Sequence, residues 1–150
     1  MKHNDRYRKI EQEQILTVLE LRAANQKWAI PALDIIRIIE SLPVKSLPQE
    51  NLAISGTIDY QNQSIPFLSL GILLENKKES NGPMVIFDHK EGHLALGLSE
   101  VYTLKRIPVS NLQLLPNIIE DTRFSSTIAK CYFDEENNIV PIVDLKYMDF

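Results

Sequence analysis

Two histidines four positions apart are the residues in this sequence that come nearest to a metal site. His89 and His93 flank a polar turn that also contains Asp88 and Glu91. A zinc-type site needs three or four such ligands that converge with fixed geometry and are held by a second layer of hydrogen bonds. Residues at a hairpin turn are commonly polar simply because they face water. We therefore expect no metal and no cofactor here.

Residue types that serve covalent or phosphoryl chemistry occur without the patterns that activate them. Cys131 and the serines have no nucleophile elbow or flanking motif, and the chain has only three histidines to act as a base. Its five glycines are scattered singly, so no glycine-rich loop can cradle a phosphate. The carboxylates of Glu135 and Glu136 lie in an expected turn, where they are solvated. The sequence predicts a protein that is not an enzyme and that works through its surfaces.

Composition and charge limit the kinds of partner and the cellular compartment that the sequence allows. The net charge of −4 argues against a nucleic-acid partner, because phosphate backbones are held by clustered Lys and Arg. Cys131 is the only cysteine, which excludes an internal disulfide and suits a reducing compartment. No apolar run approaches the ~18 residues of a membrane-spanning helix, and the charged start is not a signal peptide. We expect a cytoplasmic protein with a flexible tail at 1–14 and no direct membrane insertion.

An internal repeat organises the rest of the chain. Three blocks recur in the same order, which predicts one supersecondary unit used twice. A unit of roughly 65 to 75 residues buries too little surface to be stable alone, so the two copies should share a core. We expect copies at about 15–74 and 84–150 with a linker at about 75–83, and exchange of end strands between them stays open. The paired blocks are 29–35 with 95–101, 42–48 with 107–116, and 65–70 with 140–145.

Short apolar segments between polar turns predict a mainly β protein, as in small barrels or sandwiches. Residues 31–34 predict one helical turn and 35–39 a strand, with a helix over 32–40 as the competing interpretation. Proline cannot donate a ladder hydrogen bond, so Pro66 and Pro141 predict edge strands or bulges. Trp28 is expected in the core. The predicted hairpins pair 15–21 with 28–30, 56–60 with 64–68, 84–87 with 93–96, and 126–133 with 139–143.

The order of these blocks resembles the CheW family. The segment Trp28–Ile39 is followed by Gly56–Leu70, and the blocks Leu94–Val101 and Ile139–Leu145 stand in the family's corresponding places. The resemblance covers about residues 15–148 and lies in the order of both halves, since no single motif is diagnostic. It implies an all-β fold of two SH3-like five-stranded β-barrel subdomains packed together, with short helical turns.

The resemblance also implies a function. CheW-like proteins are non-catalytic adaptors of chemotaxis-type two-component signalling arrays. They bind the regulatory domain of a CheA-type histidine kinase, to which they are similar, and the cytoplasmic tip of methyl-accepting chemoreceptors. An adaptor of this kind is recruited to membrane-associated receptor arrays. The alternatives are a divergent scaffold of a pilus-type or twitching pathway with altered partner specificity, and a small barrel that binds a peptide or nucleic acid.

Two departures from the family fall on the implied partner-binding segments. Where the family's turn usually reads Asn-Leu-Arg-Gly, with the arginine implicated in coupling, this chain has Asp59, Tyr60, Gln61 and Asn62. At Arg37 the family often carries an acidic residue. Altered charges at an interface affect which partner is bound more than how tightly it is bound. The two departures therefore indicate either a changed partner specificity or neutral drift at exposed positions.

The candidate partner-binding residues come from these two segments. For Ile35 and Tyr60, a place in the barrel core and a place on the contact surface are equally open, since alternate strand positions point inward. The full candidate set is Ile35, Arg37, Ile39, Gly56, Asp59, Tyr60, Gln61 and Asn62.

Overall fold

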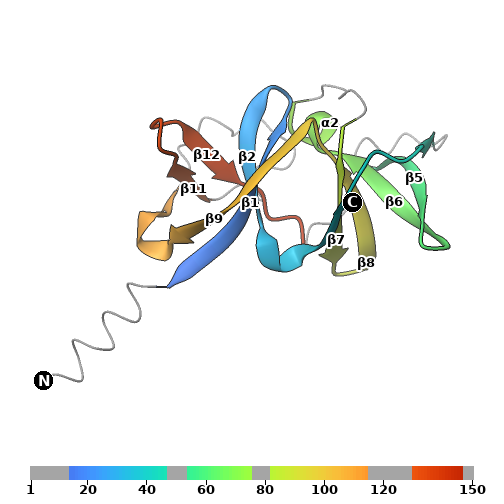
Figure 1. Ribbon diagram of the computed structural model, residues 1–150, viewed down its shortest axis with the longest axis horizontal. Helices are drawn as coiled ribbons and strands as arrows, with labels where there is room; N and C mark the ends of the chain where they lie inside the picture. The colour runs from blue at the N-terminus through green and yellow to red at the C-terminus, as the bar shows by residue number, and fades with distance from the viewer. Residues whose placement is uncertain (1–13, 47–53, 76–81, 115–129, 147–150) are drawn as a thin grey trace, which may run out of the picture.

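The computed structural model describes residues 14–46, 54–75, 82–114 and 130–146. Strands dominate these ranges and form two six-stranded sheets that lie side by side (Figure 1), which confirms the mainly β prediction. We call the sheets barrel A and barrel B. In spatial order barrel A contains β10 (Gln113–Leu114), β11 (Lys130–Phe133), β12 (Ile139–Ile142), β2 (Gln26–Pro31), β1 (Ile15–Ala23) and β9 (Glu100–Pro108). Barrel B contains β4 (Lys45–Ser46), β5 (Ile54–Tyr60), β6 (Gln63–Ser69), β8 (Gly92–Gly97), β7 (Met84–His89) and β3 (Ile35–Ile39).

Each sheet has one strand more than the five expected. The strands β4 and β10 are two residues long, which is too short for an alternating pattern to appear in the sequence. Three helical segments complete the described chain, and two of them follow a proline. They are η1 (Ala32–Asp34), η2 (Val109–Asn111) and α2 (Leu70–Glu75).

The predicted hairpins are present, with tighter turns than expected. Ala24 and Asn25 join β1 to β2 with φ of 51° and 63°, and Gln61 and Asn62 join β5 to β6 with φ of 49° and 62°. Two successive residues with positive φ are typical of the type I′ turn, whose twist matches that of the flanking strands. Gln63, assigned to a turn from the sequence, therefore belongs to a strand.

The segment after Pro31 forms the predicted helical turn and strand, and the competing helix over 32–40 is wrong. The β-branched run of β3 pairs antiparallel with β7, from Ile35 opposite Phe87 to Ile39 opposite Met84. Isoleucine loses rotamer freedom in a helix and packs well on a pleated surface, which favours the strand.

The expectation of an edge strand at Pro66 and Pro141 is wrong, but the β5–β6 pairing does have a register shift opposite Phe67 and Leu68, next to Pro66. Strand β6 lies between β5 and β8, and β12 lies between β11 and β2. The parallel pairing on the second side of each strand is found just after the proline, at Phe67 opposite Ala95 and at Ile142 opposite Ala29. At the proline itself, β6 and β12 are each paired on one side only. The N–H that proline lacks is therefore not needed there, and an interior strand can contain the proline.

Each sheet combines strands from both copies of the repeat. Barrel A takes the hairpin β1–β2 from the first copy and β9 to β12 from the second, whereas barrel B takes β7–β8 from the second copy and β3 to β6 from the first. When equivalent strands are matched, the two sheets have the same order. In Figure 1, β11 and β12 lie at one end of the molecule, β5 and β6 at the other, and the two hairpins between them.

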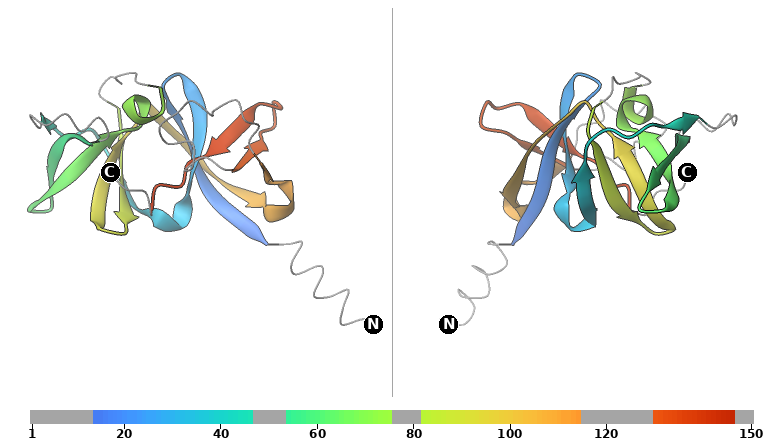
Figure 2. Two further views of the ribbon diagram at one scale, coloured as in Figure 1. Left: turned by 180° about the vertical axis from the view of Figure 1, so that it is seen from behind. Right: turned by 45° about the vertical axis from the view of Figure 1, so that its right-hand side comes forward.

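The apolar core has three parts. A central cluster joins the two exchanged hairpins, and each barrel has a smaller cluster of its own. Figure 2 shows the strands that carry these clusters in two further views. Trp28 lies in the central cluster, and its indole N–H donates to the carbonyl of Ala23 at 3.0 Å. The other buried members of the central cluster are Leu19, Leu21, Ala23, Ile30, Leu68, Leu70, Val85, Phe87, Leu94, Leu96, Leu98, Val143 and Leu145.

Several expectations concern residues outside the described ranges. These are the tail up to residue 13, most of the linker, the start of the last hairpin at 126–129 and the end of the chain after Lys146. Within the described part, Glu75 ends helix α2. The helices described there are all too short to cross a membrane.

We predict that Leu21→Ala destabilises the protein by about 2–5 kcal/mol, because it opens a cavity in the central cluster where Leu21 is fully buried. Leu33→Ala is the matched control, since Leu33 is 94% exposed and should change the free energy of unfolding by no more than about 0.5 kcal/mol. Urea unfolding of both variants measures the difference. Equal effects of the two substitutions would contradict the central core.

Candidate functional site

The candidate residues lie on two segments of barrel B, the edge strand β3 and the hairpin β5–β6. Ile39 and Tyr60 both pack against the apolar cluster of this barrel, so the structure brings these two segments to one core. Ile35, at the other end of β3, packs against the central cluster instead. Both Ile35 and Tyr60 are half-buried, and each therefore contributes to a core as well as to the surface.

Strand β3 presents three consecutive exposed side chains, Ile36, Arg37 and Ile38. The register with β7 shifts between Ile35 and Arg37, and this irregularity breaks the simple alternation of faces. Ile36 and Ile38 are each 46% exposed. Among the described strands, β3 pairs only with β7, so its outer backbone N–H and C=O groups have no strand partner in the described part of the chain and can serve as a template for a partner.

The sequence reasoning missed Ile36 and Ile38. It selected Ile35, Arg37 and Ile39, which strict alternation would place on one face. The bulge that overturns this assumption depends on pairing with β7, almost fifty residues later in the chain, and no local pattern announces it. The signal that was available is the run of four isoleucines in β3, which exceeds what one buried face can hold.

The turn of the β5–β6 hairpin is polar and exposed. Gln61 and Asn62 occupy its two positive-φ positions. Next to it, the Lys45 ammonium on β4 lies 2.8 Å from the Asp59 carboxylate, and both side chains are well exposed. An exposed pair of this kind stabilises the fold by about 1 kcal/mol at most. Its effect is to neutralise Asp59, so the turn presents amides rather than a net charge.

Gly56 on β5 is buried, and because it has no side chain, β4 can lie close to β5. A Cβ atom at this position would lie 2.2 Å from the carbonyl oxygen of Lys45 and 2.9 Å from a methyl group of Val44. Real contacts are never this short, so any side chain here would push β4 away from β5. Gly56 therefore acts on the candidate surface indirectly, by fixing the position of β4 against β5.

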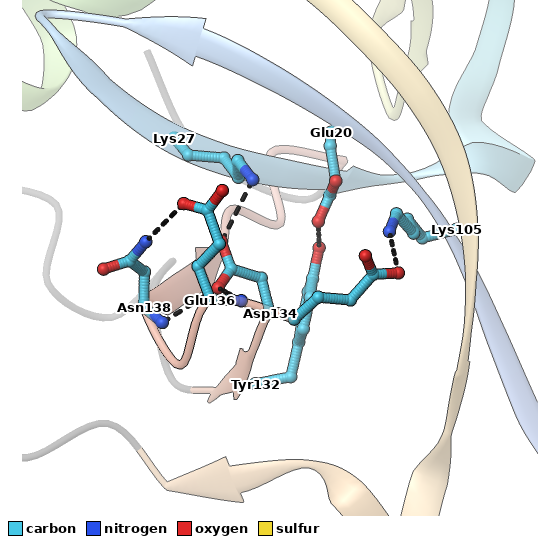
Figure 3. A network of polar contacts seen from close by, with 8 residues as sticks. Glu20, Lys27, Lys105, Tyr132, Asp134, Glu136 and Asn138 are labelled. Carbon is cyan, nitrogen blue, oxygen red and sulfur yellow. Dashed lines mark hydrogen bonds and ion pairs between the residues drawn. The ribbon is translucent and has the colours of Figure 1, made fainter.

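Barrel A carries a polar network that the sequence reasoning did not identify (Figure 3). The buried Tyr132 hydroxyl donates to the buried Glu20 carboxylate at 2.6 Å. Beside it, the Lys27 ammonium lies 3.0 Å from the Asp134 carboxylate. Lys105 pairs with Glu135 at 3.1 Å. The available signal was Glu20, a charged residue between Leu19 and Leu21 in a mostly apolar strand.

Three groups of this network have shifted pKa values. The pKa of Asp134 is lowered, first by the backbone N–H of Asn138 and then by Lys27. Lys27 has a raised pKa, mainly because it donates to Asp134. Burial and then the hydrogen bond to Glu20 raise the pKa of the Tyr132 phenol far above its ordinary value. The phenol therefore stays protonated and remains the donor to Glu20.

The histidine pair forms no metal-like cluster in the structure. His89 is buried, and its Nδ1 accepts the backbone N–H of Glu91 at 3.1 Å within the turn. In the described ranges, no three His, Cys, Asp or Glu side chains are grouped so that they could hold a metal ion. Cys131 is buried, and burial raises the pKa of its thiol.

Comparison with known proteins identifies what the chain is similar to. The family model of the CheW-like domain matches residues 17–148. The crystal structure of the scaffolding protein TtCheW from Thermoanaerobacter tengcongensis superposes with a TM-score of 0.75 at 13% sequence identity, over 87% of this chain and 89% of that one. No curated protein matches the sequence. The similarity confirms the predicted fold class of two SH3-like barrel subdomains.

We predict that Gly56→Ala destabilises the protein by about 1–3 kcal/mol, because the added Cβ overpacks against the β4 backbone. Asp59→Ala on the same strand is the control and should cost under about 1 kcal/mol, since its partner Lys45 is exposed. Urea unfolding reports both values. A Gly56→Ala variant as stable as the parent would show that β4 does not approach β5 as described.

We predict an acid-dependent loss of stability that comes in part from Asp134. Its pKa in the folded state lies below its ordinary value, so its contribution is complete above about pH 5 and is lost as the pH falls through the folded pKa. Asp134→Asn should flatten this dependence, and Lys27→Met should flatten it less, because the backbone N–H of Asn138 is the larger cause. Urea unfolding at several pH values between neutral and acid measures the pH dependence of the free energy of unfolding, and Glu135→Gln is the control.

The Asp134 prediction is contradicted if Asp134→Asn loses stability on acidification as steeply as the parent. Glu135 is the right comparison because its side chain is 89% exposed, so its own pairing with Lys105 contributes little.

Proposed function

Because this chain belongs to the CheW-like domain family, we propose that it is a non-catalytic adaptor of a chemotaxis-type signalling array. It couples methyl-accepting chemoreceptors to a CheA-type histidine kinase by binding the receptors' cytoplasmic tip and the kinase's regulatory domain. The observation that carries the proposal is the family match across both barrels, from residue 17 to residue 148. The match to a solved scaffolding protein of the same fold supports it.

The surface of barrel B supports the kinase-binding part of the proposal. Ile36 and Ile38 supply apolar area on an edge strand, with Arg37 between them. Arg and exposed apolar side chains are favoured at protein interfaces, and the strand edge adds unpaired backbone groups. The neutral turn at Gln61 and Asn62 completes this surface, together with the other candidate residues. An adaptor of this kind needs no reacting group, since holding two partners at once raises their effective concentration.

The altered charges at positions 37 and 61 support a divergent adaptor whose partners carry compensating charges. Arg37 is exposed, and Gln61 stands where the family's arginine usually lies. A kinase regulatory domain that pairs with this chain would carry an acidic group opposite Arg37. A scaffold of a pilus-type or twitching pathway is the same proposal with a different output. We place the protein in the cytoplasm, recruited to receptor arrays at the membrane.

Nucleic-acid binding is the weaker alternative. Such a surface needs a stripe of free cations and stacking aromatic rings. Three described lysines, Lys27, Lys45 and Lys105, are each paired with a carboxylate. This pairing removes charge that a phosphate backbone would need.

We predict saturable binding of this protein to the regulatory domain of the CheA-type kinase from its own organism, measured by calorimetric titration. Arg37→Glu should weaken binding by about tenfold or more, which corresponds to about 1.4 kcal/mol, because it reverses the charge at the interface. Arg106→Glu is the matched control, since Arg106 is an exposed arginine on β9, the edge strand of barrel A. It should leave the affinity within about twofold. Absence of binding by the parent protein to every such kinase would overturn the proposal.

We also predict that Ile38→Ser weakens the same complex while lowering the free energy of unfolding by only about 1 kcal/mol, because about half of the side chain is exposed before binding. Leu104→Ser on β9 is the control, since Leu104 is 59% exposed on the edge strand of barrel A. Equal loss of affinity in both variants would show that barrel B is not the preferred kinase-binding face.

A further inference from the structure

After β12 the chain leaves barrel A and runs toward β7 of barrel B, as the red segment in Figure 1 shows. The backbone N–H of Val143 donates to the carbonyl of Ala29 on β2 at 2.8 Å. Val143 and Leu145 are then buried in the central cluster, among side chains of both exchanged hairpins. We call residues 143–146 the C-terminal strap. The strap belongs to the junction of the two barrels rather than to barrel A alone.

Lys146, the last described residue of the strap, is tied to two segments of the chain. Its carbonyl accepts the backbone N–H of Lys90, in the β7–β8 turn, at 2.9 Å. Its ammonium lies 3.6 Å from the carboxylate of Asp34. Asp34 ends η1, the single turn through which the chain passes from β2 of barrel A to β3 of barrel B. The strap thus reaches both the β7–β8 turn and the crossover that leads into β3.

The Asp34–Lys146 pair is partly shielded from water. The side chain of Asp34 is 17% exposed and that of Lys146 is 34% exposed. Burial is the largest effect on the pKa of Asp34 and raises it, whereas the charge of Lys146 lowers it and the carboxylates of Asp144 and Asp88 raise it. Lys146 is therefore the group that favours the ionised form of Asp34 against burial and two like charges.

The strap also lies beside the start of β3. Ile35, which directly follows Asp34, is opposite Phe87 of β7 and packs against the central cluster. Ile35 and the strap residues Leu145 and Lys146 line the same small cavity. The register shift that exposes three consecutive side chains of β3 begins at Ile35. The exposed side chains of β3 are therefore placed from a point that the strap holds.

We propose that the Asp34–Lys146 ion pair is a latch, which holds the C-terminal strap across the junction and fixes where β3 begins. Asp34 and Lys146 are then positioning residues for the partner surface, and they act through β3 rather than by contact with the partner. The effect on a partner rests on the proposed binding of the kinase through β3. The effect on β3 itself can be measured in the protein without a partner.

The internal repeat supplies a matched control for the latch. Because block 29–35 corresponds to block 95–101, Glu100 is the equivalent of Asp34 at the start of β9. Glu100 pairs with Arg22 at 4.0 Å, and these two side chains are 56% and 45% exposed. The equivalent pair is thus longer and solvated. Glu100→Gln should break it without changing β3.

Amide hydrogen exchange of the full chain, without any partner, tests the latch first. In D34N and in K146M, exchange at the β3 amides that pair with β7 should become about fivefold faster, the size expected for one partly shielded ion pair. Exchange in β5 of the same barrel should stay as in the parent. The double variant D34N/K146M should be no faster than either single variant, because residues that act as one pair are not additive. E100Q should leave β3 unchanged.

Calorimetric titration with the regulatory domain of the CheA-type kinase then tests the positioning role. D34N and K146M should each weaken binding by about threefold or more, because binding must then also order β3. D34N/K146M should bind no more weakly than either single variant. K146R, which keeps the charge, and E100Q should both stay within about twofold of the parent.

The latch is overturned if D34N and K146M leave exchange in β3 as in the parent, or speed exchange in β5 by the same factor, which would mean a general loss of stability. Additive effects of the two substitutions on binding would mean independent contacts with the partner and would also overturn it. If β3 is loosened as expected but every variant binds as the parent does, the positioning role is wrong and kinase binding stands. If the parent protein does not bind, the proposed function fails, and the exchange result alone decides the latch.

Discussion

The packing of two exchanged hairpins against each other is the constraint on which the rest of this structure depends. A unit as small as one copy of the repeat buries a small fraction of its surface and is only marginally stable alone. The exchange solves this, because β1–β2 and β7–β8 contribute most of the central cluster and also complete a barrel each with strands of the other copy. The two copies therefore fold as one body, in which the barrels have separate cores but share their central strands.

This arrangement gives two barrels of the same topology and different chemistry. Barrel A buries a carboxylate against a phenol and surrounds them with ion pairs, whereas the corresponding core of barrel B is apolar. Both barrels present an edge strand with exposed apolar side chains, Ile36 and Ile38 on β3 of barrel B and Tyr102 and Leu104 on β9 of barrel A.

Much of this could be predicted from local sequence. The repeat, the hairpins and the strand after Pro31 follow from apolar patterns and turn residues, and the family resemblance supplied the overall fold. The remainder depends on pairing between residues far apart in the chain. The bulge beside Arg37, the close approach of β4 at Gly56 and the partner of Glu20 all depend on such pairing. The edge-strand prediction from Pro66 and Pro141 failed for the same reason. The local sequence does not show where β8 pairs with β6 or where β2 pairs with β12.

We propose that the kinase binds barrel B rather than barrel A. Amide hydrogen exchange of the full chain, with and without the regulatory domain of its CheA-type kinase, tests this most directly, because it reads every strand in one experiment. If the kinase binds barrel B, added protection falls on β3 and on the turn at Gln61 and Asn62. Protection confined to β11 and β12 of barrel A, or no protection at any strand, would contradict it.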